Sequence, residues 1–283
     1  MNIRIKESKL ALILVASLVP SLHLHAQTFA LPFTLTQSSP ALTFSIDTNG
    51  TLLETAPFNS SLSLTLTSGG SQMLWLPAYA AFRAGNFSGP SWTLADIGQY
   101  SAAFGFNTIA SGEYSVAFGS RTTASGGLST AFGLATTASN SNSFAVGAFV
   151  LASGQDGMAL GDSTIASGTD SMAVNTGSVA SGRSSFAAGA FTSANSYESF
   201  VLGQNNVGLS ETGTTPNPTV WVSTDPLFEV GNGTGSGPTP LTDALVVYKN
   251  GSMTVQGPIT AQSGVVTTAA SVANTDIPMY SGN

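Results

Sequence analysis

Three aspartates, Asp156, Asp162 and Asp170, come closest in type and spacing to a metal or catalytic site. Asp156 and Asp170 lie 14 residues apart, and carboxylates stacked at a regular spacing can bind Ca²⁺. A pair of acids across a cleft can hydrolyse glycosides, but nothing in the sequence sets two acids across one. The Gly-Gly-x-Gly-x-Asp repeat of calcium-binding solenoids is absent. We interpret the three aspartates as solvated surface acids and expect neither a metal nor a cofactor.

Nucleophilic catalysis is the second chemistry to consider, and the residues that it needs are missing. The chain has no cysteine, which excludes disulfides and thiol chemistry. The two histidines, His23 and His25, both lie in an N-terminal segment that we expect to be removed. Without them, Ser-His-Asp catalysis, Cys-His catalysis and the usual zinc sites are excluded. The sequence therefore predicts that the protein is not an enzyme.

Residues 1–26 have the pattern of a secretory signal peptide. Three basic residues lie within the first ten positions, the apolar run Leu10–Val19 follows, and the small residue Ala26 precedes the expected cleavage point. The alternative is a membrane anchor, but a run this short does not span a bilayer core of about 30 Å. We expect a secreted or cell-surface protein with no membrane span after cleavage.

The charge of the chain argues against one class of partner. The formal net charge is −7, and charged residues make up 7% of the sequence against 42% hydrophobic residues. Nucleic-acid binding needs clustered Lys and Arg, which this acidic chain lacks. Intrinsic disorder needs few apolar residues and high charge, so the composition predicts a folded protein.

An internal repeat of 14 residues dominates the middle of the chain. Each unit reads approximately S-x-A-x-G-x-x-T-x-A-S-G-x-x, and the units start at Ser101, Ser115, Ser129, Ser143, Gly157, Ser171, Ser185 and Ser199. Each half of a unit has about five alternating residues, which is the spacing of a strand. The alternative, coiled-coil heptads, is disfavoured because Gly and Ser at fixed positions destabilise every helical turn. The repeat predicts an all-β solenoid, a parallel β-roll with two strands in each 14-residue rung.

Two columns of glycine recur in the repeat, one in each half. Asn175 replaces the first glycine in one unit, and Asn140 replaces the second glycine in another. Asn is the residue other than Gly that best tolerates a left-handed backbone. We therefore expect a turn with positive φ at both columns.

Small residues and large apolar residues alternate in the first half of each unit. We assign the Ser, Ala and Gly columns to the interior of the roll, so the large side chains face outward; the opposite assignment stays open. An exposed ladder of this kind is strongly stabilised when identical chains cover it. The pattern predicts a homo-oligomer of closed symmetry. Its interface would contain Phe104, Phe118, Phe132, Phe144, Val146, Met158, Leu160 and Phe186.

A column of threonines suggests a further function. It contains Thr108, Thr122, Thr136, Thr164 and Thr192, and Val150 and Ser178 interrupt it. On an outer face, such a ladder could order water and bind ice. The simpler reading is that Thr favours strands.

The segment SVAFGSRTTASG, residues 115–126, resembles the head repeat of YadA-like trimeric autotransporter adhesins, with its pattern S-V-A-I-G-x-x-S-x-A-x-G. The resemblance covers residues 101–206. It implies a left-handed parallel β-roll, a homotrimer and an extracellular binding role, with a host matrix protein or a glycan as partner. The SVAIG stretch has been associated with collagen binding in one member of the family. By that resemblance the candidate binding residues are Ser115, Val116, Ala117, Phe118 and Gly119.

The sequence divides into five parts. These are a signal peptide (1–26), an N-terminal β-rich cap (27–100), the head β-roll (101–206), a C-terminal β cap (207–260) and a flexible tail (261–283). In the N-terminal cap, Trp75, Phe82, Phe87 and Trp92 are expected to cover the first rung, with an aromatic sugar-binding platform as the alternative. Asn-Gly pairs at Asn232 and Asn250 predict turns in the C-terminal cap.

The function that these observations favour is binding rather than catalysis. The sequence predicts an exported trimeric head module of an adhesin, which mediates cell-surface or extracellular binding. The first alternative is a purely structural extracellular fibre or spacer, and the second is an ice- or glycan-binding solenoid.

Overall fold

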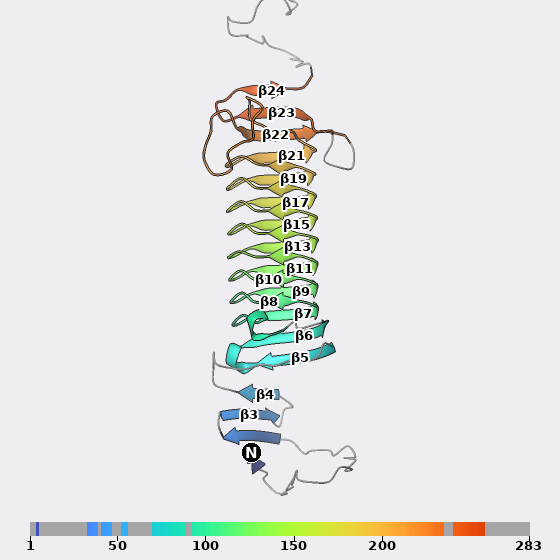
Figure 1. The fold of residues 1–283 in the computed structure, drawn as a ribbon, viewed down its shortest axis with the longest axis vertical. Helices are drawn as coiled ribbons and strands as arrows, with labels where there is room; N and C mark the ends of the chain where they lie inside the picture. Colours follow the sequence, from blue (N-terminus) through green and yellow to red (C-terminus); the bar gives the residue numbers. More distant parts are fainter. Residues whose placement is uncertain are drawn as a thin grey trace, which may run out of the picture.

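The computed structural model describes a long roll of stacked strands with additional strands at both ends (Figure 1). It describes residues 4–5, 33–38, 41–46, 52–55, 70–88, 92–234 and 240–257. Apart from Arg4–Ile5, which form the short strand β1, the expected signal peptide lies outside these residues. The expected flexible tail also lies outside the described residues.

The repeats form a β-solenoid in which each rung contributes a long and a short strand. The long strands are β7 (Ala102–Phe106), β9 (Val116–Ser120), β11 (Thr130–Leu134), β13 (Phe144–Ala148), β15 (Met158–Asp162), β17 (Met172–Thr176), β19 (Phe186–Ala190) and β21 (Phe200–Gln204). The short strands are β8 (Ile109–Ala110), β10 (Thr123–Ala124), β12 (Thr137–Ala138), β14 (Leu151–Ala152), β16 (Ile165–Ala166), β18 (Val179–Ala180) and β20 (Ser193–Ala194). Seven complete turns result, and the eighth unit supplies only its long strand.

In both sheets, each residue of the repeat's strands pairs with the residue 14 positions further along the chain, which is the period of the repeat. Ala117 pairs with Ala131 in the sheet of long strands, and Ala124 pairs with Ala138 in the sheet of short strands, all in parallel. The turns are bonded between rungs as well: Tyr114 N donates to Gln99 O at 2.8 Å. The predicted parallel β-roll with 14-residue rungs is therefore confirmed.

The interior of the roll is made of small side chains, as predicted. Both alanine columns are fully buried between the two sheets. Their members are Ala103, Ala117, Ala131, Ala145, Ala159, Ala173 and Ala187 in the long strands, and Ala110, Ala124, Ala138, Ala152, Ala166, Ala180 and Ala194 in the short strands. Alternation within a strand then turns the large apolar residues outward.

The threonine column also faces the interior, which contradicts the ice-binding hypothesis. Thr108, Thr122, Thr136 and Thr164 are 0% exposed. The reason is strand alternation, since Thr108 lies two residues before the inward-facing Ala110 and so shares its side. A buried ladder cannot order water at a surface.

The expectation of positive φ is confirmed for the first glycine column and wrong for the second. Gly119 has φ = 129°, and Asn175 holds the same column at 85°. Gly112 and Gly126 in the second column do not have positive φ; glycine there reflects close packing, because a Cβ on Gly112 would lie 1.9 Å from Gly126 O. The left-handed residues are instead found two positions after each column, for example Tyr114 (φ 57°) and Arg121 (φ 55°).

The N-terminal end is closed by β5 (Gly70–Leu76), the 3₁₀ turn η1 (Pro77–Tyr79), β6 (Ala81–Phe87) and the 3₁₀ turn η2 (Leu94–Asp96). Strand β6 pairs in parallel with β7, and β5 pairs antiparallel with β6. Trp92 is fully buried beside Phe87, and its indole N–H donates to Thr108 O of the first rung at 2.9 Å. Phe87 and Trp92 thus cap the roll, whereas Trp75 is 40% exposed.

The segment before this cap forms an antiparallel sheet of its own, in the order β1-β2-β3-β4. Its other strands are β2 (Phe33–Ser38), β3 (Ala41–Ile46) and β4 (Leu52–Thr55).

The C-terminal end adds β22 (Pro226–Asn232), β23 (Asp243–Tyr248) and β24 (Met253–Val255). Strand β22 continues the parallel stack from β21, and the other two strands follow it antiparallel. Asn250-Gly251 forms the predicted turn, in which Gly251 N donates to Tyr248 O at 2.9 Å. Asn232 is the last residue of β22, and a longer connection, not a tight Asn-Gly turn, leads to β23.

Candidate interaction surface

The outer face of the long-strand sheet is an apolar surface that the described residues leave partly exposed. This sheet has 13 strands, from β5 at one end to β24 at the other. Phe118 is 48% exposed, Met158 36% and Phe200 42%. The proposed interface residues of the roll all lie on the outward side of their strands: Phe104, Phe118, Phe132, Phe144, Val146, Met158, Leu160 and Phe186. We call this surface the apolar face.

Aromatic rings stack along the apolar face from rung to rung. The ring centroids of Phe82 and Phe104 are 5.4 Å apart, those of Phe104 and Phe118 5.3 Å, and those of Phe118 and Phe132 5.7 Å. The stack resumes near the other end, where Phe186 and Phe200 lie 4.6 Å apart. These distances fit favourable aromatic pairs, so neighbouring rings of the stack stabilise one another.

The apolar face continues onto both caps. Met73 on β5 is 75% exposed, and Met253 on β24 is 57% exposed. Phe228 of β22 follows Phe200 in register, with ring centroids 6.0 Å apart. The sequence did not indicate this continuity, because the caps lack the 14-residue period.

The candidate binding stretch is split between the interior and the apolar face. Ser115 and Ala117 are fully buried in the roll, and the Ser115 hydroxyl donates to Gly112 O at 2.6 Å. Gly119 belongs to the positive-φ column on the same side of the strand. Of the five residues, only Val116 and Phe118 point outward, onto the apolar face. A ligand of this stretch would therefore reach only these two side chains, both of which belong to the apolar face.

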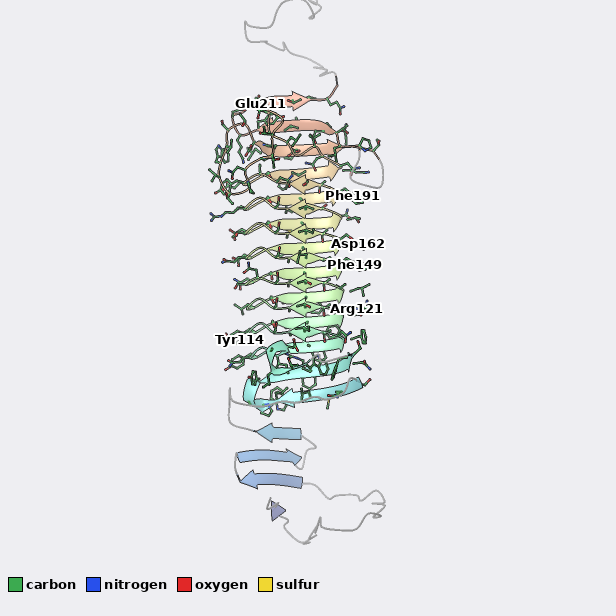
Figure 2. All side chains as sticks on the ribbon, in the orientation of Figure 1. Tyr114, Arg121, Phe149, Asp162, Phe191 and Glu211 are labelled. Carbon is green, nitrogen blue, oxygen red and sulfur yellow. The ribbon has the colours of Figure 1, made fainter. Side chains whose placement is uncertain are left out.

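The turns carry exposed residues that the repeat pattern does not indicate. One edge of the roll presents Tyr100, Tyr114 and Leu128, which are 47%, 50% and 60% exposed, and the two tyrosine rings stack at 4.9 Å. The other edge presents Arg121 and Phe149, the latter 61% exposed (Figure 2). All five have positive φ. Their signal in the sequence is positional, two residues after each glycine column, where the residue type varies along the roll.

The three aspartates of the repeat do not form a cluster. Asp156 accepts a hydrogen bond from the Asn142 side chain at 2.8 Å, and Asp162 accepts one from Ser163 at 2.9 Å. Asp162 lies near the edge that carries Arg121 and Phe149 (Figure 2). Within the described part of the chain, no group of three His, Cys, Asp or Glu side chains is close enough to hold a metal ion.

A buried charged side chain, Arg83 or Glu229, lies at each end of the interior alanine column. Arg83 pairs in register with Ala103 and is fully buried; its guanidinium donates to Ser101 O and Ala110 O, both at 2.9 Å. Burial lowers the pKa of Arg83 to about 10, although Asp96 acts in the opposite direction. Glu229 pairs with Val201 at the other end, and burial raises its pKa to about 7.

The comparisons with known proteins agree with this geometry. Residues 97–122, 124–149 and 152–174 match the family model described as "YadA head domain repeat (2 copies)". The chain carries YadA head domain repeats. No curated protein matches the chain. Among the described residues, no helix is both long and apolar enough to cross a membrane.

The matched YadA head repeats cover the first rungs of the roll, but neither its last rungs nor the two caps. The matched residues extend from just before the first rung to Val174 in strand β17. The last rungs keep the same register, since β19 pairs with β21 exactly as β17 pairs with β19. The buried charges Arg83 and Glu229 both lie outside the matched residues.

Proposed function

We propose that this protein is the non-catalytic head of an exported homotrimeric adhesin, displayed at a bacterial surface. The observation that carries the proposal is the apolar face, which extends along a roll built from YadA head repeats. A monomer with this surface in water would leave many aromatic and aliphatic side chains exposed, and each large side chain that is fully buried contributes roughly 1.5–3 kcal/mol. Three identical chains packed around an axis would cover it.

The trimer leaves other surfaces free for a ligand. The outer side of the short-strand sheet lies opposite the apolar face, and the two edges of turns lie between the two sheets. Their repeated side chains would make many weak contacts, and three chains in one particle would multiply the effect through avidity. A matrix protein or a glycan is the expected partner. In this proposal Val116 and Phe118 belong to the interface between the three chains, not to the ligand-binding surface.

The mass of the intact assembly in solution tests the trimer. We expect three copies per particle at micromolar concentration. Phe132→Ser, on the apolar face, should weaken the assembly, whereas the matched change Leu151→Ser, on the outer side of the short-strand sheet, should leave it intact. A monomeric wild-type protein, or equal effects of the two substitutions, would contradict the proposal.

Binding of the purified protein to matrix proteins and glycans separates an adhesin from a structural spacer. An adhesin gives saturable binding that weakens when the trimer is dissociated. A spacer gives no saturable binding to any of them. The spacer is the second candidate because the apolar face explains assembly without requiring a ligand.

A further inference from the structure

The C-terminal cap is joined to the last rung by two acidic side chains, Glu229, which is buried, and Asp243, which is half-buried. Glu229 on β22 is 2% exposed, and its carboxyl group accepts hydrogen bonds from Asn206 Nδ2 at 2.8 Å and from Gly208 N at 3.1 Å. Asp243 on β23 accepts one from Val207 N at 3.0 Å. Three consecutive residues, which lead the chain out of the last rung, are thus held by two acids from the cap.

No positive charge faces these two acids among the described residues. On β21, the neighbour of Glu229 is Val201, and on β23 it is Val246. The charged group that acts on Glu229 is Asp243, another acid. Lys249, the cation of this cap, interacts with Asp225 and Glu198 instead and lies 5.1 Å from the centroid of the Trp221 ring.

We propose that Glu229 and Asp243 form a proton-dependent latch, which holds the C-terminal cap on the roll while Glu229 is protonated and loosens when both acids are charged. The buried Glu229 loses its hydration when it is charged, and the like charge of the half-buried Asp243 repels it. The open cap exposes both to water, where they ionise freely.

The direction of the effect follows from the environment of the carboxyl group. Burial is the main cause of the raised pKa of Glu229, about 7, and the charge of Asp243 raises it further. The hydrogen bonds from Asn206 and Gly208 favour the carboxylate but do not offset burial. The pKa of Asp243 is also raised by burial. Since an exposed Glu has its ordinary pKa of about 4.5, raising the pH favours the open cap.

Hydrogen exchange of the full chain, read by mass spectrometry and corrected for the intrinsic pH dependence, tests the latch. The amides of Val207 and Gly208 report on its closure, and the amides of β9 in the middle of the roll serve as the internal reference. Between about pH 6 and about pH 8, the two pKa values predict a roughly tenfold increase in cap opening.

The variant Glu229→Gln removes the charge and keeps the shape, so the exchange of Val207 and Gly208 should become independent of pH. If this variant does not fold, Asp243→Asn serves instead and should reduce the pH dependence. The matched control is Glu211→Gln in the same cap, an exposed carboxylate that binds Asn250 and Ser252 and that should leave the pH dependence unchanged.

Two results would overturn the latch. The first is exchange of Val207 and Gly208 that does not change with pH in the wild-type protein, or that changes equally in Glu229→Gln. The second is slow exchange of Val207 and Gly208 that returns at high pH when Ca²⁺ is added. The two carboxylates would then bind a metal ion instead of responding to a proton. Neither result bears on the trimer, which rests on the apolar face.

Discussion

The buried threonine column allows a sharp test of how the interior of the roll is stabilised. Thr122 and Thr164 are 0% exposed, and their hydroxyl groups have no hydrogen-bond partner. Val150 occupies the same column and is 1% exposed, so the interior accepts valine at this position. Replacing Thr122 with Val keeps the shape of the side chain and removes a polar atom that folding takes out of water.

The size of the effect follows from the missing hydrogen bond. Burying an unsatisfied hydroxyl costs about 1–3 kcal/mol. We expect Thr122→Val to raise the free energy of unfolding by about 1 kcal/mol, at the low end of that range because the hydroxyl could relax towards a neighbouring carbonyl. Thr164→Val should contribute a similar amount, and the two should add because three rungs separate them.

Denaturant and thermal unfolding measure the change, at one fixed protein concentration because assembly adds to apparent stability. About 1 kcal/mol corresponds to a shift in Tm of roughly 2–4 °C for a domain of this size. Val150→Thr is the reverse control and should destabilise. Thr192→Val should bring no gain, since the Thr192 hydroxyl lies 2.8 Å from the Ser178 hydroxyl. Destabilisation by Thr122→Val would refute the reasoning, because it would mean that the hydroxyl is paired.

Other predictions concern the rungs and their two ends. Gly133→Ala should destabilise by at least about 2 kcal/mol in the same unfolding assay, because φ is 125° and the added Cβ would lie 1.9 Å from Gly147 O. Arg83→Met should cost about 2–4 kcal/mol, because Ser101 O and Ala110 O lose their charged donor; an unchanged free energy would contradict its capping role. The free energy of unfolding should fall by on the order of 3 kcal/mol between about pH 4.5 and about pH 7, because folding raises the pKa of Glu229. That loss should be absent in Glu229→Gln. A free energy of unfolding that rises over this pH range would contradict a raised pKa of Glu229 in the folded protein.

Much of the roll could be read from the sequence, because a 14-residue period leaves few possible registers. If every rung repeats, then Ala117 must stack on Ala131, and the small columns must share one side. Once the small columns were assigned to the interior, the alternation of side chains along the strand turned Phe118 outward. The same alternation from Ala110 would have placed Thr108 inside the roll, so the ice-binding hypothesis failed on a rule that the sequence already contained.

The turns were less predictable because glycine columns have two physical causes. Gly119 is needed both for its positive φ and because the next rung comes too close for a Cβ, whereas Gly112 is needed for that close approach alone. Both look the same in a sequence. The residues that do adopt left-handed backbone, such as Tyr114 and Phe149, have no common chemistry and so leave no pattern of residue types.

The sequence alone determined the repeating unit, its register and the separation of small and large columns onto opposite sides of each long strand, because these depend on relations between residues a fixed distance apart. The structure decided that the alanine columns face the interior, where the two sheets bury them completely. The tertiary structure decided what ends the roll. Arg83 and Glu229 lie in segments without the period, and only strand pairing with Ala103 and Val201 brings them into the alanine column. Within the repeat, each rung packs between two rungs of the same sequence pattern, so the period specifies its neighbours. A terminal rung has such a neighbour on one side only, and the residues that cover its other side come from segments outside the repeat.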